Sequence, residues 1–280
     1  GELVAVTGDG VNDVPALEAA DVGVAMGERG NRTAQDVASI ILLDDNFRSI
    51  AAAIAEGRQL FANLQASFQY LLLIHIPLVL SAAFIPLAGY PLLYLPIHIV
   101  LLELVIHPTA LLAFQSTAGP LQIPRERRTR EVHLFGRAEW VRVLMGGGLA
   151  TALVMAAYPW SIGATGDPQH ARAMSLAVLL FSGAGFAAAL SRLRTRLSRA
   201  IVIATLAAAL AIIAVGPIAR VLQLSPLRPH ELLIAGLAAV VSALPLLAAL
   251  TRPRTSGASE CRPGPRSTPP GGRPRPRAGR

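Results

Sequence analysis

The feature that most constrains this chain is a series of about six apolar stretches, each about twenty residues long. A helix of about 20 apolar residues crosses the hydrocarbon core of a bilayer, so each stretch can span a membrane. The expected spans are 68–87, 92–114, 141–162, 174–190, 200–219 and 232–250. Because the apolar residues lie in long blocks, the sequence predicts a helical membrane bundle rather than one soluble core.

Arginine supplies all the basic charge of the chain, which contains no lysine and has a formal net charge of +8. Two links between expected spans are rich in arginine, namely Arg125, Arg127, Arg128, Arg130 and Arg137 in one and Arg192, Arg194, Arg196 and Arg199 in the other. Because positive loops stay cytoplasmic, we expect both chain ends in the cytoplasm and the protein in the cell (plasma) membrane. Membrane orientation accounts for this charge, so the lipid bilayer, and no nucleic acid, is the expected partner.

The first 46 residues differ from the rest, because they alternate short β-branched runs with polar turns and helical stretches. We expect strands at 4–7, 22–26 and 39–43 and helices at 13–20 and 33–38. Such alternation indicates a parallel sheet, in which the loops after the strands carry the chemistry. The predicted fold class is therefore an α/β fragment followed by an α-helical bundle of about six transmembrane helices.

Three further regions follow this α/β fragment. Residues 47–67 have apolar side chains at helical spacing and predict a connecting helix, and 68–251 form the expected transmembrane domain. The tail at 252–280 is rich in Pro, Gly and Arg, so we expect a disordered cytoplasmic segment. Weak attraction to anionic headgroups is the simpler interpretation of this tail, and a specific partner is the alternative. Its Cys261 is the only cysteine, so no disulfide framework exists.

The first expected strand ends in the sequence "TGDG" (7–10), and Asn12 and Asp13 follow it. Two carboxylates and an amide beside glycines are hard oxygen ligands that suit Mg²⁺, which commonly accompanies phosphate. The following helix directs its N-terminal N–H groups toward the same loop and favours an anion there. The alternative is a tight turn with a helix cap, since Asp and Asn serve that purpose routinely.

The segments around this loop resemble a known family. The sequences "TGDGVNDVPALEAADVGVAMG" and "TAQDVASIILLDDNF", followed by "EGRQLFANLQ", resemble the hinge and phosphorylation-domain end of the P-type cation-transporting ATPases, which are haloacid dehalogenase-like. The resemblance covers most of 4–114 and, beyond Gln115, rests on hydropathy and the number of spans. It implies the C-terminal part of an ATP-driven cation pump.

The resemblance also implies roles for the loop residues. Asp9 would ligate Mg²⁺, and Asp13 would support the metal and the attacking water. The phosphoryl group would contact Asn12 and Gly10, while the residues that shape the loop would be Thr7 and Gly8. The implied cofactors are Mg²⁺ and ATP, and the implied partner is the missing N-terminal part of the pump, which holds most of the ATP site. The family's phosphorylated Asp, in a D-K-T-G-T motif, is absent from this chain.

An isolated carboxylate marks the second expected span. Glu103 is the only charged residue between Arg58 and Arg125. A carboxylate at mid-membrane depth costs several kcal/mol unless it is protonated or faces a polar interior, so we expect a functional role. The alternative is a structural hydrogen bond between helices.

Two histidines accompany Glu103. His107 follows four residues later on the same helical face and directly precedes Pro108, and His75 lies two residues before Pro77 in the preceding span. Because proline lacks an N–H group, we expect both helices to break and to leave free carbonyls beside the carboxylate. Glu103, His107 and His75 are thus a possible site for the transported cation, whose identity stays open between protons and metal ions. His75 has the simpler alternative of packing between helices.

Two other classes of function remain open. The chain can be a non-catalytic membrane fragment or a regulatory or assembly module that lacks the phosphorylated Asp. It can also be a phosphatase head on a membrane anchor, which the absence of a D-x-D motif after a strand disfavours.

Overall fold

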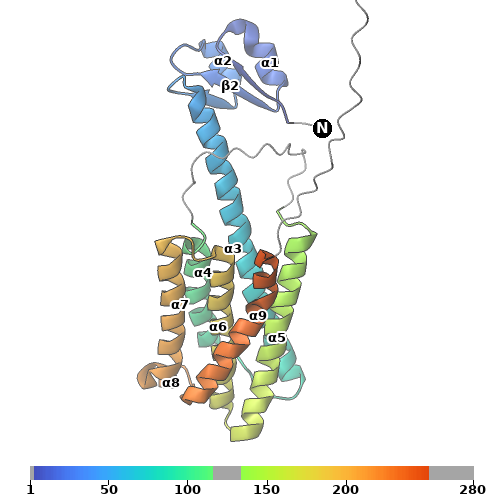
Figure 1. The fold of residues 1–280 in the computed structure, drawn as a ribbon, viewed down its shortest axis with the longest axis vertical. Helices are drawn as coiled ribbons and strands as arrows, with labels where there is room; N and C mark the ends of the chain where they lie inside the picture. Colours follow the sequence, from blue (N-terminus) through green and yellow to red (C-terminus); the bar gives the residue numbers. More distant parts are fainter. Residues whose placement is uncertain (1–2, 116–133, 252–280) are drawn as a thin grey trace, which may run out of the picture.

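The computed structural model describes residues 3–115 and 134–251 of the 280-residue chain. A small α/β unit, one long helix and a helical bundle follow one another along the chain (Figure 1). This order confirms the predicted fold class. The expected disordered tail, with Cys261, and most of the first arginine-rich link lie outside the described residues.

The α/β unit is a three-stranded parallel sheet with the strand order β1-β2-β3. Its elements are β1 (Ala5–Gly8), the 3₁₀ turn η1 (Val11–Asp13), α1 (Val14–Ala19), β2 (Val22–Met26), α2 (Arg32–Val37) and β3 (Ile40–Leu42). Thr7 pairs in register with Val24, which pairs with Ile40 on the other side. The three carboxyl ends therefore meet at one edge of the sheet.

Both faces of the sheet are covered, although by different elements. Ala25 packs with Leu17 of α1 and Ala34 of α2 in a small buried cluster. On the opposite face, the cluster around Met26 includes Ile50, which belongs to the long helix α3 (Phe47–Leu87). The alternation of side chains along β2 thus ties the sheet to the start of α3.

The outer edge of β1 has no partner strand among the described residues, because β1 pairs only with β2. Two of the four residues of β1, Ala5 and Thr7, are exposed, whereas β2 is almost entirely buried. An unpaired edge presents free backbone N–H and C=O groups, and native proteins normally cover such edges.

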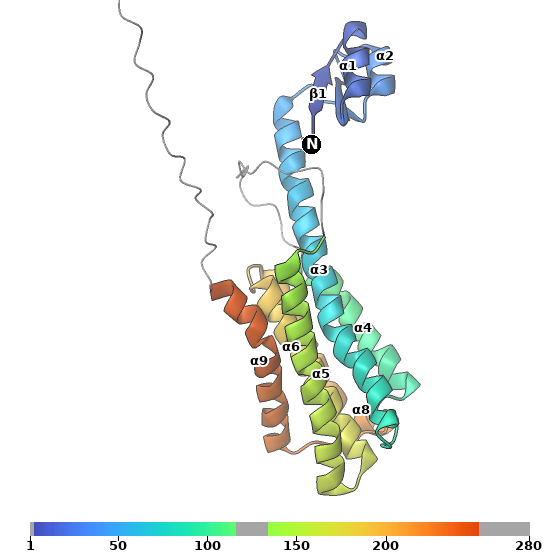
Figure 2. The ribbon, with the colours of Figure 1, turned by 90° about the vertical axis from the view of Figure 1, so that its right-hand side faces the viewer.

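Helix α3 runs for 41 residues without interruption and joins the sheet to the bundle (Figure 2). Asn46 caps its start by accepting a hydrogen bond from the backbone N–H of Arg48. The predicted break at Pro77 is wrong, since Pro77 lies inside the helix, and α4 (Pro96–Leu112) likewise continues through Pro108. A proline removes one N–H donor, but the intact turns on either side keep these helices continuous.

The bundle contains α4 and five further helices, which are α5 (Arg137–Thr165), α6 (Pro168–Ser191), α7 (Arg196–Ala214), α8 (Gly216–Val221) and α9 (Pro229–Thr251). Within the described ranges, five helices are long and apolar enough to cross a membrane, namely α3, α5, α6, α7 and α9. Helix α4 is a shorter apolar helix of 17 residues. The expected span at 200–219 divides at Val215, which separates α7 from α8.

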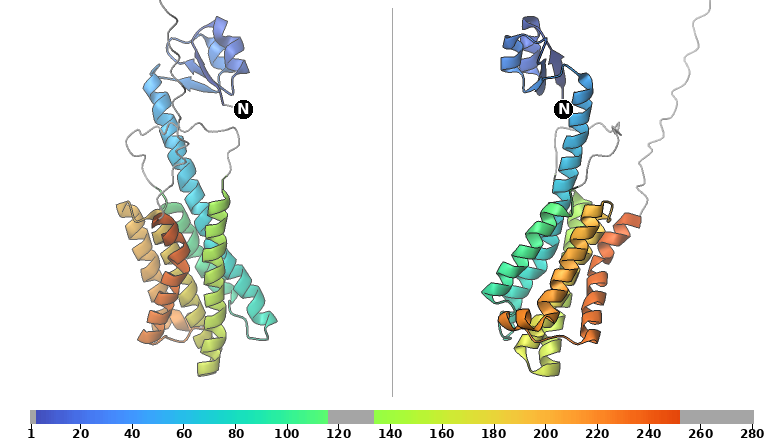
Figure 3. Two further views of the ribbon diagram at one scale, coloured as in Figure 1. Left: turned by 45° about the vertical axis from the view of Figure 1, so that its right-hand side comes forward. Right: turned by 90° about the vertical axis from the view of Figure 1, so that its left-hand side faces the viewer.

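Helix α6 lies at the centre of the bundle, between α5, α7 and α9 (Figure 3). Its most apolar window is 83% buried, whereas the corresponding windows of the other candidate spans are 28–39% buried. The helix is rich in Ala, Gly and Ser, which allow neighbouring helices to approach closely.

A polar contact joins three helices at the end of the bundle farthest from the sheet. His170 of α6 lies with Nδ1 2.8 Å from Oγ of Ser161 on α5. Its Nε2 lies 3.2 Å from Oε2 of Glu231 on α9. All three residues are buried, so this contact connects the α5–α6 pair to the start of α9.

Candidate functional site

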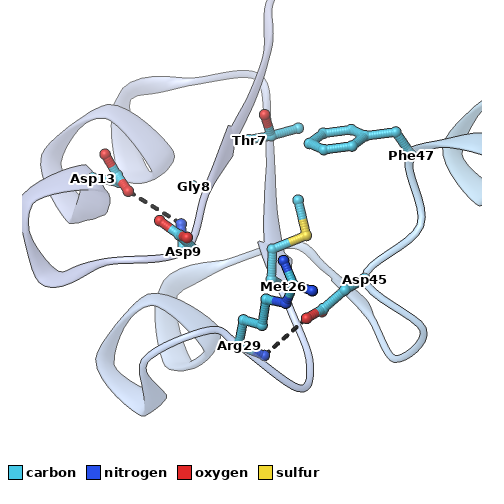
Figure 4. Close-up of a pocket in the computed structure, with 8 residues that line it drawn as sticks. All are labelled: Thr7, Gly8, Asp9, Asp13, Met26, Arg29, Asp45 and Phe47. Carbon is cyan, nitrogen blue, oxygen red and sulfur yellow. Dashed lines mark hydrogen bonds between the residues drawn. The ribbon is translucent and has the colours of Figure 1, made fainter.

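A pocket of about 310 Å³ lies at the carboxyl end of β1 (Figure 4). The residues that line it are Thr7, Gly8, Asp9, Asp13, Met26, Arg29, Asp45 and Phe47. They come from the loops that follow all three strands and from the first residue of α3. The parallel sheet brings these segments together because it aligns the carboxyl ends of its strands.

The two carboxylates of the predicted loop have different surroundings. Oδ2 of Asp13 accepts hydrogen bonds from the backbone N–H groups of Asp9 and Gly10, at 3.1 and 3.0 Å. A Cβ atom at Gly8 would lie 2.5 Å from Cβ of Asp13, so the side chain of Asp13 needs glycine there. Within the described part of the chain, no hydrogen bond or ion pair engages the carboxylate of Asp9. Asp13 therefore shapes the loop, and Asp9 offers a free carboxylate to the pocket.

The pocket contains only part of the predicted set of residues. Thr7, Gly8, Asp9 and Asp13 line it, whereas Asn12 and Gly10 are not among its lining residues. Asn12 is exposed in the 3₁₀ turn η1. The roles that the resemblance implies for these residues stay predictions.

Four lining residues were not predicted, namely Met26, Arg29, Asp45 and Phe47. Each of them ends or follows β2 or β3. Because the loops after parallel strands meet at one edge of the sheet, the predicted alternation of strands and helices could have identified them. Arg29 is the only cation among the lining residues, and its side chain extends toward the pocket in Figure 4.

The second predicted cluster also assembles, because α3 and α4 place its three side chains in contact. Nε2 of His75 lies 3.4 Å from Oε1 of Glu103. Nδ1 of His107 lies 2.9 Å from Oε2 of the same carboxylate, and the two imidazole centroids are 6.4 Å apart. The chain thus brings its isolated membrane carboxylate between two histidines.

The backbone contact of His75 determines where its protons lie. Nδ1 of His75 is 2.8 Å from the carbonyl oxygen of Leu71, and a carbonyl oxygen only accepts, so Nδ1 carries the hydrogen. The other ring nitrogen, Nε2, faces the carboxylate of Glu103. That contact is favourable only when a second proton is present, either on Nε2 or on the carboxyl group. The geometry thus places Nε2 of His75 and Oε1 of Glu103 where they can share a proton.

The second carboxylate oxygen of Glu103 faces His107. Nδ1 of His107 lies 2.9 Å from Oε2 and 3.2 Å from the backbone carbonyl oxygen of Glu103, so it has two neighbouring oxygens. Oε2 is buried and makes no well-aligned hydrogen bond, so its contact with His107 is an ion-pair contact by distance alone. No group of three or more His, Cys, Asp or Glu side chains in the described ranges is arranged to hold a metal ion. The three side chains are thus a cluster of one carboxylate between two imidazoles, not a preformed metal cage.

Two family models match this chain. Residues 91–251 match the C-terminus of the cation transporting ATPases, and residues 1–54 match the haloacid dehalogenase-like hydrolases. The chain belongs to the P-type cation-transporting ATPases. This assignment confirms the predicted family and shows a multi-pass membrane protein of the ATPase class. It does not favour the alternative of a regulatory or assembly module.

Individual P-type ATPases agree with the family models. A calcium-transporting ATPase of Bacillus subtilis is 35% identical over 158 residues, which are 56% of this chain and 18% of that protein. The sodium/potassium-transporting ATPase subunit alpha-3 of Gallus gallus is 51% identical over 92 residues, or 33% of this chain and 9% of its own length. A potassium-transporting ATPase alpha chain 1 of Xenopus laevis is 41% identical over 140 residues, or 49% of this chain and 14% of the relative.

The chain spans less than a fifth of the length of these curated relatives. The names of these relatives specify different cations, namely calcium, potassium, and sodium with potassium. The family assignment therefore leaves the transported ion open, and the ion must be argued from the side chains of this chain.

Proposed function

We propose that this chain is the C-terminal part of an ATP-driven cation pump, in which the pocket at Asp9 handles phosphoryl groups and the cluster at Glu103 binds the transported cation. The observation that carries this proposal is that one continuous helix, α3, connects the two places. Phe47 at its start lines the pocket, and His75 farther along it contacts Glu103.

The pocket residues fit Mg²⁺ in part. Asp9 has a free carboxylate, and the Oδ1 atom of Asp13 is not used by the loop hydrogen bonds. Two carboxylates are fewer ligands than Mg²⁺ takes, so phosphate oxygens and water would complete the shell. Bound there, Mg²⁺ would neutralise charge that develops during phosphoryl transfer. Asp13 would keep the N–H groups of Asp9 and Gly10 in place around it.

The open edge of β1 supports a place for the phosphorylated aspartate. A parallel strand that pairs with the outer edge of β1 would end beside Asp9, because parallel strands align their carboxyl ends. A strand from another part of a longer pump would bring the D-K-T-G-T aspartate and, with a separate domain, ATP. This arrangement assigns attack to that aspartate and metal binding to Asp9.

The exposure of the Glu103 cluster supports a second contact with the rest of a pump. The side chains of Glu103 and His75 are each 34% exposed, and that of His107 is 57% exposed. Apolar residues of the same helices are exposed nearby, including Leu104 and Val79. Lipid does not solvate a carboxylate, so we propose that further membrane helices of the pump cover this surface and complete the ion site.

The pairing of Glu103 with two histidines favours a proton as one of the transported ions. A carboxylate with two imidazoles can exchange protons without the many oxygen ligands that calcium needs. Neither histidine offers an oxygen, so Glu103 alone supplies side-chain oxygens in this cluster. We therefore favour proton transport or proton exchange over transport of calcium.

The experiment is the substitution Glu103→Gln in the complete pump. Glutamine keeps the shape of the side chain and removes its charge, so phosphorylation from ATP should persist. Stimulation by the transported ion should fall about tenfold or more, as expected when a charged hydrogen-bond partner is lost. The measurement is phosphoenzyme decay and ATPase activity across a panel of cations and a range of pH.

Glu56→Gln serves as the control, because Glu56 is an exposed carboxylate on the same helix, far from the cluster. It should retain the wild-type ion and pH profiles. A Glu103→Gln pump with the wild-type profile would assign Glu103 a structural role and would exclude this cluster as the ion site.

A further inference from the structure

Both oxygens of the Asp45 carboxylate accept hydrogen bonds from backbone N–H groups of one loop. Oδ1 accepts from Gly27 at 2.7 Å and from Glu28 at 3.1 Å, and Oδ2 accepts from Arg29 at 2.9 Å. Asp45 lines the pocket, but both of its oxygens are used (Figure 4). Its side chain is therefore suited to hold this loop and not to bind a metal ion.

The same loop continues directly to the backbone of Asp9. Asn31, at the end of the loop, donates its backbone N–H to the carbonyl oxygen of Asp9 at 2.7 Å. Asp45 thus connects to Asp9 through a short, continuous series of hydrogen bonds and peptide units. Only residues 27–31 lie between Asp45 and Asp9 along this series. A displacement of Asp45 must therefore either deform these residues or displace Asp9.

The loop has little room to absorb a shift. A Cβ atom at Gly30 would lie 1.9 Å from the carbonyl oxygen of Met26, and one at Gly27 would lie 2.7 Å from that of Leu42. From the other side, Nε2 of Gln35 donates toward the carbonyls of Met26, Gly27 and Gly30, at 2.8–3.2 Å. Backbone packed this closely moves as a unit.

Asp45 also belongs to the turn that starts α3, since it lies two residues before Phe47. Its φ of 47° is in the left-handed region, which Asp adopts more readily than most residues. We propose that Asp45 is a positioning residue that ties the start of α3 to the metal-binding Asp9, so that movement of the membrane helix adjusts the phosphoryl site. This inference rests on the proposed function of the two sites.

Asparagine cannot replace this carboxylate. It offers one acceptor oxygen, and its NH₂ group would face an N–H donor of the loop. Asp45→Asn therefore leaves either the N–H group of Arg29 or those of Gly27 and Glu28 without an acceptor. The loop should loosen without any change in the ligands of the metal.

Asp44 provides a matched control one residue away. Its Oδ2 accepts from Oγ of Ser49 at 2.6 Å and its Oδ1 from the N–H of Asn46 at 3.2 Å. The hydrogen bond from Ser49 lowers the pKa of the Asp44 carboxyl, so it too carries a charge at neutral pH. The loop N–H groups at 27–29 bond to Asp45 and not to Asp44, so Asp44→Asn removes a charge from the same turn without cutting the connection.

The test compares Asp45→Asn with Asp44→Asn in the complete pump. We expect Asp45→Asn to raise the Mg²⁺ concentration for half-maximal phosphoenzyme decay by about tenfold, as for other residues that orient metal ligands. Ion stimulation of decay should fall in the same variant, and amide hydrogen exchange should rise at Gly27–Arg29. Asp44→Asn should match the wild type in all three measurements. If the substitution only destabilised the protein, the amount of active pump would fall, but the Mg²⁺ concentration for half-maximal decay would stay the same.

Two outcomes overturn the inference. One is an Asp45→Asn pump with wild-type Mg²⁺ dependence and exchange, and the other is an equal effect of Asp44→Asn. If Asp45→Asn does not fold, Asp45→Glu decides, since it keeps the charge on a longer side chain and should shift the Mg²⁺ dependence where Asp44→Glu does not. A wild-type pump that forms no phosphoenzyme would refute the proposed function instead, and the exchange data would still test the connection.

Discussion

Asp9 and Asp13 are the same residue type in the same loop, yet the structure gives them different tasks. One carboxylate oxygen of Asp13 accepts hydrogen bonds from two backbone N–H groups, and its side chain packs against Gly8, where a Cβ atom would collide with it. Asp9 is the residue whose carboxylate stays free beside the pocket. Chemical identity alone does not separate a ligand from a loop anchor, whereas the hydrogen bonds do.

This difference predicts the effect of Asp9→Asn in the complete pump. Removing the free carboxylate removes charge from the proposed Mg²⁺ site, so phosphoenzyme turnover should fall about 100-fold or more. The measurement is the rate of phosphoenzyme decay as a function of Mg²⁺ concentration. Glu18→Gln, at an exposed position of α1, is the control. Unchanged turnover in Asp9→Asn would show that another residue holds the metal.

The sequence predicts the first strand and the loop at 7–13, because a β-branched run followed by Gly and Asp is a strong local signal. Arg29 and Asp45 lack such a signal. They reach the pocket only because β2 and β3 pair in parallel with β1, and register between strands depends on contacts distant in the sequence. For this reason the local part of the site was predicted and the remainder was not.

At the scale of whole elements, hydropathy finds the spans but not their ends. The window over 200–219 passes through Gly216 and Pro217 because both lie among apolar residues. In the structure, Val215 is extended, with ψ of 105°, and α8 starts at Gly216. Pro217 lies in the first turn of α8, where its missing N–H group would have no partner within the helix, so it suits a new helix start. A hydropathy average does not record these backbone restrictions.

The contact of Glu231 with His170 predicts the stability of the bundle end. Glu231 also accepts the backbone N–H of Arg228 at 2.7 Å, so Glu231→Ala leaves two donors without an acceptor. The expected loss is about 1–3 kcal/mol in the free energy of unfolding. Thermal unfolding of the pump in detergent measures it, and His230→Ala, at the exposed neighbouring position, should leave the midpoint unchanged. Equal midpoints for both variants would contradict the assignment.

At the scale of the whole molecule, the arginines described from α5 onward divide between the two ends of the bundle. Arg137, Arg142, Arg192, Arg194, Arg196 and Arg199 lie toward the sheet unit, and Arg172, Arg220 and Arg228 lie toward the opposite end. Positive charge stays in the cytoplasm, so this distribution agrees with a cytoplasmic sheet unit. If α4 crosses the membrane as expected from the sequence, the number of spans is even and the chain's other end would lie on the same side.

Labelling of Cys261 tests this orientation, because Cys261 is the single cysteine of the chain. A membrane-impermeant thiol reagent should label it only after the cells are permeabilised. Cys261→Ser gives the background from other thiols of the complete protein. Labelling of Cys261 in intact cells would reverse the proposed orientation.

The central place of α6 was not predicted, because lipid-facing and protein-facing helices have similar hydropathy. The mean hydropathy of its best window is 2.0, and that of the peripheral α7 is 2.2. Small residues along α6 do distinguish it, since Ala, Gly and Ser favour close packing of helices in a membrane. The content of small residues in a span thus indicates whether it packs among other helices better than its mean hydropathy does.

The uninterrupted course of α3 has a geometric consequence. From Phe47 to His75 the helix contains no proline, and at 1.5 Å per residue this segment is about 42 Å long. Such a rod acts as a lever, so a tilt of about 5° about its cytoplasmic end would move His75 sideways by about 4 Å. That displacement exceeds the 3.4 Å that separates His75 from Glu103. A small rotation at the Asp9 pocket is therefore large enough to open or close the contact between His75 and Glu103.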